Sequence, residues 1–308
     1  MDWFIGAATF LFGLTFGSFL NVVIHRVPRG ESIVFPSSAC PRCHKEIKAY
    51  DNVPVVSWLV LGGRCRNCRE PINPRYAIVE LIVATLFFAC YWRFGLTLAA
   101  FKYSVFSFLV TGLIFIDAEH KLLPDVMTLP GLIVGLVFSW FIPVNDLFAE
   151  LLPIFVRVPH GSRFNWHWLS LCDAALGAIV GAAFIFGVGF IYLHARGVEG
   201  MGLGDVKLMA MVGAFLGAKL TVLTMFAASL LGTVFGVTLM LIVWSQRTRR
   251  RIARNRESQQ AARKHAWGSA RLVYRHYQMP FGVFLGSMAL FALFFGKRLM
   301  GWYWGLYL

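Results

Sequence analysis

The feature that most constrains this chain is a series of apolar runs, each close to the length that crosses a lipid bilayer. A spanning helix needs ~20 predominantly apolar residues. With 58% apolar and 14% charged residues, the chain is too apolar for a soluble domain of this size. We therefore predict an all-α polytopic membrane protein with about eight transmembrane helices. The expected spans lie near residues 3–24, 76–92, 96–116, 126–142, 171–193, 203–216, 222–244 and 281–295.

This pattern divides the chain into three parts. We place a first transmembrane helix at residues 1–24, a polar loop domain at 25–75 and a polytopic membrane domain at 76–308. The first run has no basic segment ahead of it and no small-residue cleavage site before Asn21, so we expect it to be retained as a helix. The membrane domain carries a basic insertion near residues 245–279.

The positions of the basic residues indicate how the chain crosses the membrane. The net charge is +14. If the N-terminus lies outside and eight helices follow, the inner loops hold 22 of the 29 Lys and Arg residues. Cytoplasmic loops of membrane proteins carry such an excess. We therefore expect the N-terminus outside and the loop domain in the cytoplasm.

Two longer segments between the expected spans have unusual compositions. Residues 247–275 contain nine Arg and one Lys, opposed only by Glu257. A helical arm of this charge suits anionic membrane lipid, at ~1 kcal/mol per basic residue near the surface. Nucleic-acid binding is the alternative, but in a membrane protein we favour lipid and expect no nucleic-acid partner. Residues 143–170 have aromatic side chains and little charge, so we expect an outward interfacial flap there.

The loop domain contains two CxxC pairs, Cys40 with Cys43 and Cys65 with Cys68, separated by 21 residues. Four thiolates at such a spacing form the closed tetrahedral site of a structural zinc ribbon. A redox pair is the alternative, but redox motifs usually use one CxxC on a βαβ pattern. We therefore predict structural Zn²⁺, which would contribute to the folding of a loop with little apolar content. Four thiolates leave no open position for a catalytic water.

Two acidic residues stand at the edges of apolar segments, where a carboxylate costs free energy. Asp117 closes the run at 101–116, and Asp205 follows Gly202 and Gly204 at the start of another run. In the orientation above, both aspartates lie at the cytoplasmic face. Two such carboxylates are candidates for a general acid and base pair. Because the glycines lack Cβ, the backbone there can take positive φ and approach another chain closely, so a substrate strand could lie against it.

Other acidic residues on this face have simpler expected roles. Asp125 follows Pro124, and we expect its charge to complement a helix N-terminus. Glu80 lies early in a membrane helix. We expect Glu80 to be solvated among the headgroups or paired with an arginine such as Arg75.

Taken together and in this order, the motifs resemble those of the type IV prepilin peptidase family. These are the bifunctional leader peptidases and N-methyltransferases of type IV pilus and type II secretion systems. The resemblance covers most of the chain. Besides the paired CxxC loop, it rests on Gly17-Ser18-Phe19-Leu20-Asn21-Val22, His25-Arg26-Val27-Pro28-Arg29, Ser57-Trp58, Arg75-Tyr76 with Glu80-Leu81, Ile116-Asp117, Leu123-Pro124-Asp125, Gly202-Leu203-Gly204-Asp205 and Pro280-Phe281-Gly282.

The resemblance implies a GxGD-type aspartic protease of the bacterial inner membrane, with Asp117 and Asp205 at the two catalytic positions. It implies cleavage of a short basic leader from prepilins or pseudopilins at the cytoplasmic face. We expect Glu119 and Glu199 to attract that leader, and Gly202 with its neighbouring glycine Gly204 to contact the substrate.

The resemblance also implies methylation of the new N-terminal residue with S-adenosylmethionine as the methyl donor. The sequence shows no Gly-rich βαβ nucleotide motif, so this second activity rests on the resemblance alone. Members of the wider family without the cysteine loop are peptidases only. This suggests that the zinc ribbon serves methyl transfer or substrate docking.

From the residues alone, two other functions stay open. A transporter or channel would use Asp117 and Asp205 as a proton relay or ion site. That function predicts internal repeats, which are not evident, and carboxylates near the middle of the membrane. A zinc-ribbon scaffold of a secretion machine would carry out no chemistry and would leave both aspartates unexplained.

Overall fold

The structure is a computed structural model and describes residues 2–144, 166–197, 201–255, 258–276 and 280–305. The described residues are mainly helical, with two isolated β-bridges in the loop domain. The predicted all-α fold class is therefore confirmed. The helices are α1 (Trp3–Arg26), α2 (Val56–Val60), α3 (Arg75–Phe94), α4 (Leu98–His120), α5 (Asp125–Phe141), α7 (Trp166–Arg196), α8 (Leu203–Leu216), α9 (Ala218–Asn255), α10 (Gln259–His276), α11 (Phe281–Phe291) and α12 (Lys297–Gly305). Shorter helical turns are η1 (Val27–Arg29), η2 (Ala49–Asp51) and the π-helical η3 (Ala292–Gly296).

Within the described residues, six helices are long and apolar enough to cross a membrane. They are α1, α3, α4, α7, α9, and α11 continued through η3 and α12. In contrast, α5 is a shorter apolar helix of 17 residues, and α8 has only 14. Each run that we expected to span the membrane is thus helical, but six rather than eight reach a spanning length.

α3 and α4 form an antiparallel hairpin because distinct signals end one helix and start the next. Gly95 adopts φ +69° and stops α3. The Thr97 hydroxyl then accepts a hydrogen bond from the Ala100 N–H at 3.3 Å, as the N-cap of α4. α4 therefore runs back toward the start of α3 and ends at His120, near the loop domain.

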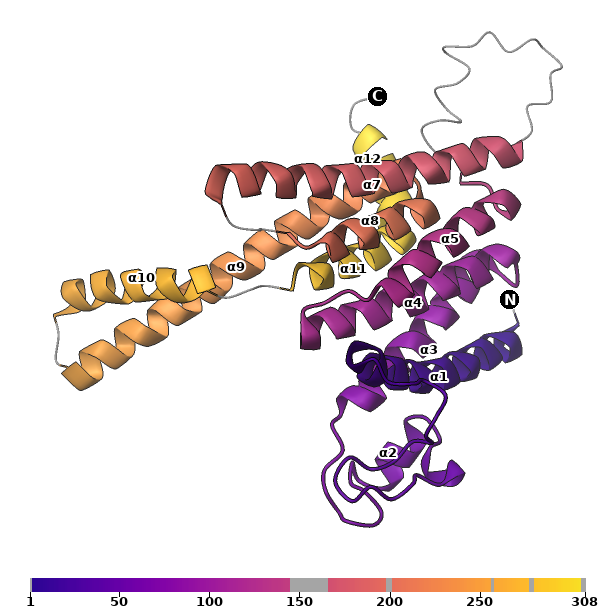
Figure 1. Cartoon of the computed structure of the whole chain (residues 1–308), viewed down its shortest axis with the longest axis horizontal. Helices are drawn as coiled ribbons and strands as arrows, with labels where there is room; N and C mark the ends of the chain where they lie inside the picture. The colour runs from indigo at the N-terminus through magenta and orange to yellow at the C-terminus, as the bar shows by residue number, and fades with distance from the viewer. Residues whose placement is uncertain (1, 145–165, 198–200, 256–257, 277–279, 306–308) are drawn as a thin grey trace, which may run out of the picture.

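α8 is the most enclosed helix of the second half of the bundle, where it packs against α5 and α7 (Figure 1). All of its residues from Leu208 to Leu216 are buried. Its contact with α7 depends on two glycines, since a Cβ on Gly213 would come within 2.1 Å of the Gly177 carbonyl oxygen. Such small-residue contacts allow membrane helices to approach closely.

The basic insertion forms an arm in which α10 folds back along the end of α9 (Figure 1). The indole N–H of Trp244 donates to the Arg263 carbonyl oxygen at 3.1 Å. The rings of Trp244 and Trp267 meet edge to face, with centroids 6.0 Å apart. Ala262 and Ala266 are buried in the same contact. The expected helical arm is therefore a two-helix hairpin.

Most of the expected outward flap, at residues 145–165, lies outside the described part of the chain. Its two described flanks are connected by Ser170 at the start of α7. The Ser170 hydroxyl donates to the Ser139 carbonyl oxygen at 2.6 Å and accepts from the Val144 N–H at 2.9 Å.

Candidate active site and metal centre

Asp117 lies in the last turn of α4, with only 5% of its surface exposed. Lys121 ends this helix in the left-handed conformation, and its N–H bonds to the Asp117 carbonyl oxygen at 2.9 Å. The Asp117 side chain is directed to α11, where Oδ2 accepts a hydrogen bond from the Val283 N–H at 3.0 Å. A buried carboxyl group thus has a backbone donor from a distant helix.

The start of α11 is shaped to receive this carboxyl group. α11 begins at Phe281, and the first N–H groups of a helix have no partner within it. The positive end of the helix dipole favours a carboxylate at this place. Gly282 permits the contact, because a Cβ there would lie 2.8 Å from Asp117 Oδ2.

Asp205 lies in the first turn of α8, and its N–H bonds to the Gly202 carbonyl oxygen at 3.1 Å. Leu123, just beyond α4, is close to both Gly204 beside Asp205 and Gly282 beside Asp117. Each aspartate thus lies beside a glycine that packs against the same leucine side chain. The fold therefore brings both sequence candidates to one end of the bundle, from two different helices.

Neither Gly202 nor Gly204 uses the positive φ that glycine permits. Gly202 is the N-cap of α8, with φ −80° and ψ 152° that suit any residue. The missing Cβ of Gly204 is used within the chain, because a Cβ there would lie 3.0 Å from Leu123 Cβ. A Cβ at Gly202 would make only an ordinary van der Waals contact, with the Gly204 nitrogen 3.8 Å away.

The charged residues nearby form ion pairs between helices. Arg75, at the start of α3, binds both carboxylate oxygens of Glu119 at the end of α4. Lys207 of α8 contacts both carboxylate oxygens of Asp125 at 2.7 Å. Asp125 lies in the first turn of α5, as expected, and in addition ties α5 to α8. Glu199 lies outside the described residues.

Glu80 has a role that sequence reasoning missed. It is 8% exposed, and its Oε2 accepts a hydrogen bond from the Val55 N–H of the loop domain at 2.7 Å. The expectation that Glu80 is solvated or paired with Arg75 is therefore wrong. The available signal was a carboxylate placed in an apolar helix, which needs a buried donor. Nothing in the spacing pointed to Val55 as that donor.

The four loop cysteines come together, as their spacing predicted. Their Sγ atoms all lie within 4.8 Å of one another, and those of Cys40 and Cys68 are 3.8 Å apart. A tetrahedral zinc ion with Zn–S bonds of ≈ 2.3 Å sets its sulfur atoms about 3.8 Å apart. All four are free thiols. The cluster therefore has the size and donor set of a structural zinc site.

Both CxxC pairs adopt the same local fold. The first cysteine of each pair, Cys40 or Cys65, donates its N–H to the carbonyl oxygen five residues later. His44 and Arg69, which follow the second cysteine in each pair, adopt positive φ. Backbone hydrogen bonds from Cys68 and from the residue before it lower the pKa of the Cys65 thiol to about 7. Because a metal ligand must be a thiolate, this arrangement favours binding.

Two known protein families match consecutive parts of the chain. A bacterial Peptidase A24 N-terminal domain matches residues 11–94, which include the loop domain, and the Type IV leader peptidase family matches residues 103–237. The aspartate pair thus lies within the second match and the cysteines within the first. No solved structure was found to match the chain.

Several relatives are similar over most of their length, and each bears the name prepilin leader peptidase/N-methyltransferase. One from Pseudomonas aeruginosa is 37% identical over 75% of this chain and 80% of the relative. One from Myxococcus xanthus is 39% identical over 76% of this chain, although the match spans only 63% of that relative. One from Aeromonas hydrophila is 31% identical over 98% of this chain and 95% of the relative. This multi-pass membrane protein therefore belongs to the Type IV leader peptidase family.

Proposed function

We propose that this protein is a prepilin leader peptidase in which Asp117 and Asp205 form the catalytic pair. The position of both aspartates at one end of the bundle, beside glycines that pack against the same Leu123, supports the proposal. The names of the relatives support it and indicate prepilins or pseudopilins as the substrates. Gly202, where an added Cβ would meet no atom closer than 3.8 Å, would contact the substrate strand, and Gly204 would keep α8 close to Leu123.

The arrangement suits hydrolysis of a peptide bond by general acid and base catalysis. Two neighbouring carboxyl groups resist being ionised at the same time, because their negative charges would repel each other. Such a pair therefore shares one proton. The ionised group takes a proton from water, and the water oxygen bonds to the scissile carbonyl carbon. The protonated group donates to the carbonyl oxygen, and the C–N bond then breaks as the amine nitrogen gains a proton. The α11 N-terminus supports this chemistry by fixing the orientation of Asp117.

We further propose that this site faces the cytoplasm at the bacterial inner membrane, with the N-terminus of the chain outside. The excess of basic residues in the loops on that side supports this orientation. Glu119 and Glu199 would then attract a basic leader. Glu119 keeps its ion pair with Arg75, and the 37% of its side chain that is exposed would face the leader. Charge reversal at both glutamates with unchanged cleavage of a basic-leader substrate would refute this part.

A second proposed activity is N-methylation of the new amino terminus, with S-adenosylmethionine as the methyl donor. The names of the relatives support it. The described residues form no βαβ nucleotide motif, and we assign the donor no residues. The four cysteines fit Zn²⁺, which would fix the shape of the loop domain for docking or methyl transfer.

The arm of α9 and α10 is proposed to bind anionic lipid. Trp244 and Trp267 lie side by side, as tryptophans do at a membrane boundary. Arg247 lies about one helical turn after Trp244 in α9. Arg263 of α10 lies at the same level as Trp244, because its carbonyl oxygen accepts a hydrogen bond from the Trp244 indole. Both arginines would therefore meet the lipid headgroups. Binding to vesicles containing phosphatidylglycerol should weaken when Arg247 and Arg263 are replaced by Gln.

The purified protein in lipid vesicles should be incubated with a prepilin, with and without S-adenosylmethionine. Mass spectrometry should show loss of the leader in both cases and addition of one methyl group only when the donor is present. A transporter or a scaffold would leave the prepilin intact, and that result would refute the proposal.

A further inference from the structure

We propose that Glu80 is a positioning residue, whose carboxyl oxygen holds the loop domain in one fixed place beside the aspartate pair. The proposal rests on the proposed function, because it assumes that the loop domain forms one side of the site where prepilin binds. No motif or comparison above gives Glu80 this role.

The surroundings of Glu80 show that its carboxylate is enclosed by three parts of the chain. The residue lies in the second turn of α3 and is buried. Oε2 accepts the Val55 N–H at 2.7 Å, and the Ser18 hydroxyl of α1 is a second donor near the carboxylate. α1 and α3 touch here, since a Cβ on Gly17 would lie 2.6 Å from Glu80 Cα. A carboxylate in such a place needs these donors.

On the loop side, the contact uses a strained residue. Val55 has φ +61° and ψ −49°, a conformation that β-branched residues rarely adopt. Such strain persists only where the surroundings over-determine it. In this conformation the Val55 N–H meets Glu80 Oε2, directly before α2 begins.

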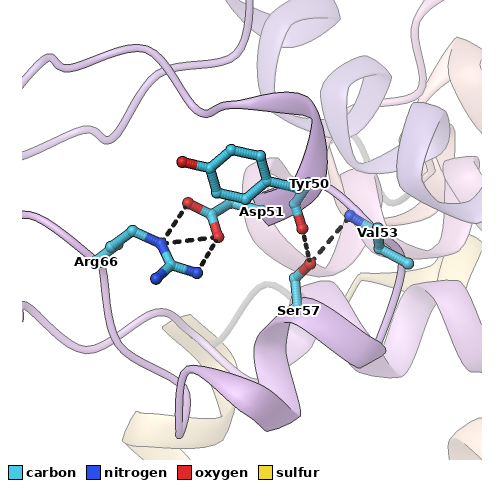
Figure 2. Close-up of polar contacts among 5 residues, drawn as sticks. All are labelled: Tyr50, Asp51, Val53, Ser57 and Arg66. Carbon is cyan, nitrogen blue, oxygen red and sulfur yellow. Dashed lines mark hydrogen bonds and ion pairs between the residues drawn. The ribbon is translucent and has the colours of Figure 1, made fainter.

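The rest of the turn is held from within the loop domain (Figure 2). The Ser57 hydroxyl accepts the Val53 N–H at 3.1 Å and donates to the Tyr50 carbonyl oxygen at 3.1 Å. Arg66 binds both carboxylate oxygens of Asp51, which connects this turn to the second CxxC pair. This turn is therefore connected to the four-cysteine cluster, and Glu80 anchors the turn to the membrane helices.

α3 carries a second connection that leads to the active site. Arg75, at the start of the same helix, pairs with Glu119, two residues after Asp117 on α4. The first two turns of α3 thus join the loop domain through Glu80 and the Asp117 turn through Arg75. Moving the loop domain away from Glu80 would change its place relative to Asp117.

This role requires an acceptor oxygen at the right distance, not a negative charge. Glu80→Gln keeps the length of the side chain and an acceptor oxygen, but removes the charge. Glu80→Asp keeps the charge, but its side chain is one methylene shorter, so its carboxylate oxygens no longer reach the Val55 N–H. The proposal therefore predicts that the Glu80→Gln variant behaves like wild type and that the Glu80→Asp variant does not. A catalytic or leader-attracting carboxylate would show the opposite order.

The experiment uses the full-length protein in nanodiscs, with wild type, both Glu80 variants and Leu81→Ala as a control on the exposed side of α3. Hydrogen exchange at the Val55 amide should accelerate about tenfold or more in Glu80→Asp. The KM for prepilin cleavage should rise about fivefold in that variant, with kcat nearly unchanged. Glu80→Gln and Leu81→Ala should match wild type in both measurements.

Three results would overturn the proposal: impairment of Glu80→Gln alone, impairment of both Glu80 variants, or wild-type behaviour of both. The exchange measurement needs no substrate. A wild-type protein that leaves prepilin intact but shows the expected exchange pattern would therefore refute the proposed function and keep the anchoring role.

Discussion

The Val283 N–H donates a hydrogen bond to Asp117 Oδ2 at 3.0 Å, so the N-terminus of α11 holds a carboxyl group buried at the end of α4. These two residues are 166 positions apart in the chain. The direction of the Asp117 carboxyl group therefore depends on the place where α11 begins. The proposed catalytic pair consequently involves three helices, α4, α8 and α11.

Gly282→Ala should impair cleavage without unfolding the protein. The added Cβ would lie 2.8 Å from Asp117 Oδ2 and would push the carboxyl group out of place. Displacement of a catalytic group by about 1 Å can cost about 100-fold in rate, so we expect a loss of about 10–100-fold in kcat/KM. Prepilin cleavage measured with the purified variant checks this.

Gly301→Ala is the matched control for Gly282→Ala, because no atom lies within 4 Å of a Cβ at that position in α12. It should cleave prepilin at the wild-type rate. Equal activity of the two variants would show that the contact between Gly282 and Asp117 does not matter for catalysis.

The loop domain should contain one zinc ion per chain. Cys43→Ser removes one of the four clustered thiols, whereas Cys172→Ser removes a thiol outside the cluster. Because zinc binding contributes to the folding of such a loop, the first variant should lose zinc and expose the loop to protease. Elemental analysis and limited proteolysis check both effects. Full zinc content in Cys43→Ser would argue against the four-cysteine site.

Lys102→Met should stabilise the protein. The Lys102 side chain is fully buried in α4, and its ammonium group has no hydrogen-bond partner among the described residues. It lies 5.3 Å from the Tyr103 ring, which compensates only in part for lost hydration. Met has a similar length and no charge, so we expect a gain of about 1–3 kcal/mol in the free energy of unfolding.

Unfolding of the Lys102 variant in mixed detergent micelles should be compared with that of Lys264→Met, at an exposed position in α10. The exposed substitution should change stability by no more than about 0.5 kcal/mol. A loss of stability in Lys102→Met would mean that its ammonium group has a partner beyond the contacts described here.

Gly213→Ala should weaken the packing of α8 against α7. The new Cβ would meet the Gly177 carbonyl oxygen at 2.1 Å, so the helices must separate. Overpacking of this kind typically costs about 1–3 kcal/mol. The same change at Gly187 of α7, where no atom lies within 4 Å, should have little effect. Similar unfolding of both variants would contradict the close contact.

Local sequence signals predicted the helices and the clustering of the four loop cysteines, and they singled out two candidate aspartates. Each apolar run became a helix, because its composition leaves no other way to satisfy the backbone in lipid. The cysteines could be recognised because metal ligands follow fixed short spacings. Asp117 and Asp205 could be recognised because a carboxylate at a membrane edge is costly. Each of these signals is local: an apolar run, a CxxC pair or a single carboxylate beside an apolar segment.

Contacts between distant segments could not be predicted in the same way. The Glu80 hydrogen bond to Val55 depends on how the loop domain sits on α3, and no local pattern encodes that position. The burial of Lys102 depends in the same way on helix packing. Gly204 makes room for Leu123 of the same chain, a contact that only the packed structure reveals.

The most direct test of the central claim is prepilin cleavage by Asp117→Asn and Asp205→Asn, with leader release followed by mass spectrometry. Asn keeps the shape of each side chain but can neither take a proton from water nor donate a carboxylic acid proton. Each substitution should reduce the rate by about 10²–10⁴-fold, while zinc content and helical circular dichroism stay at wild-type values. Cleavage at the wild-type rate by either variant would contradict the account.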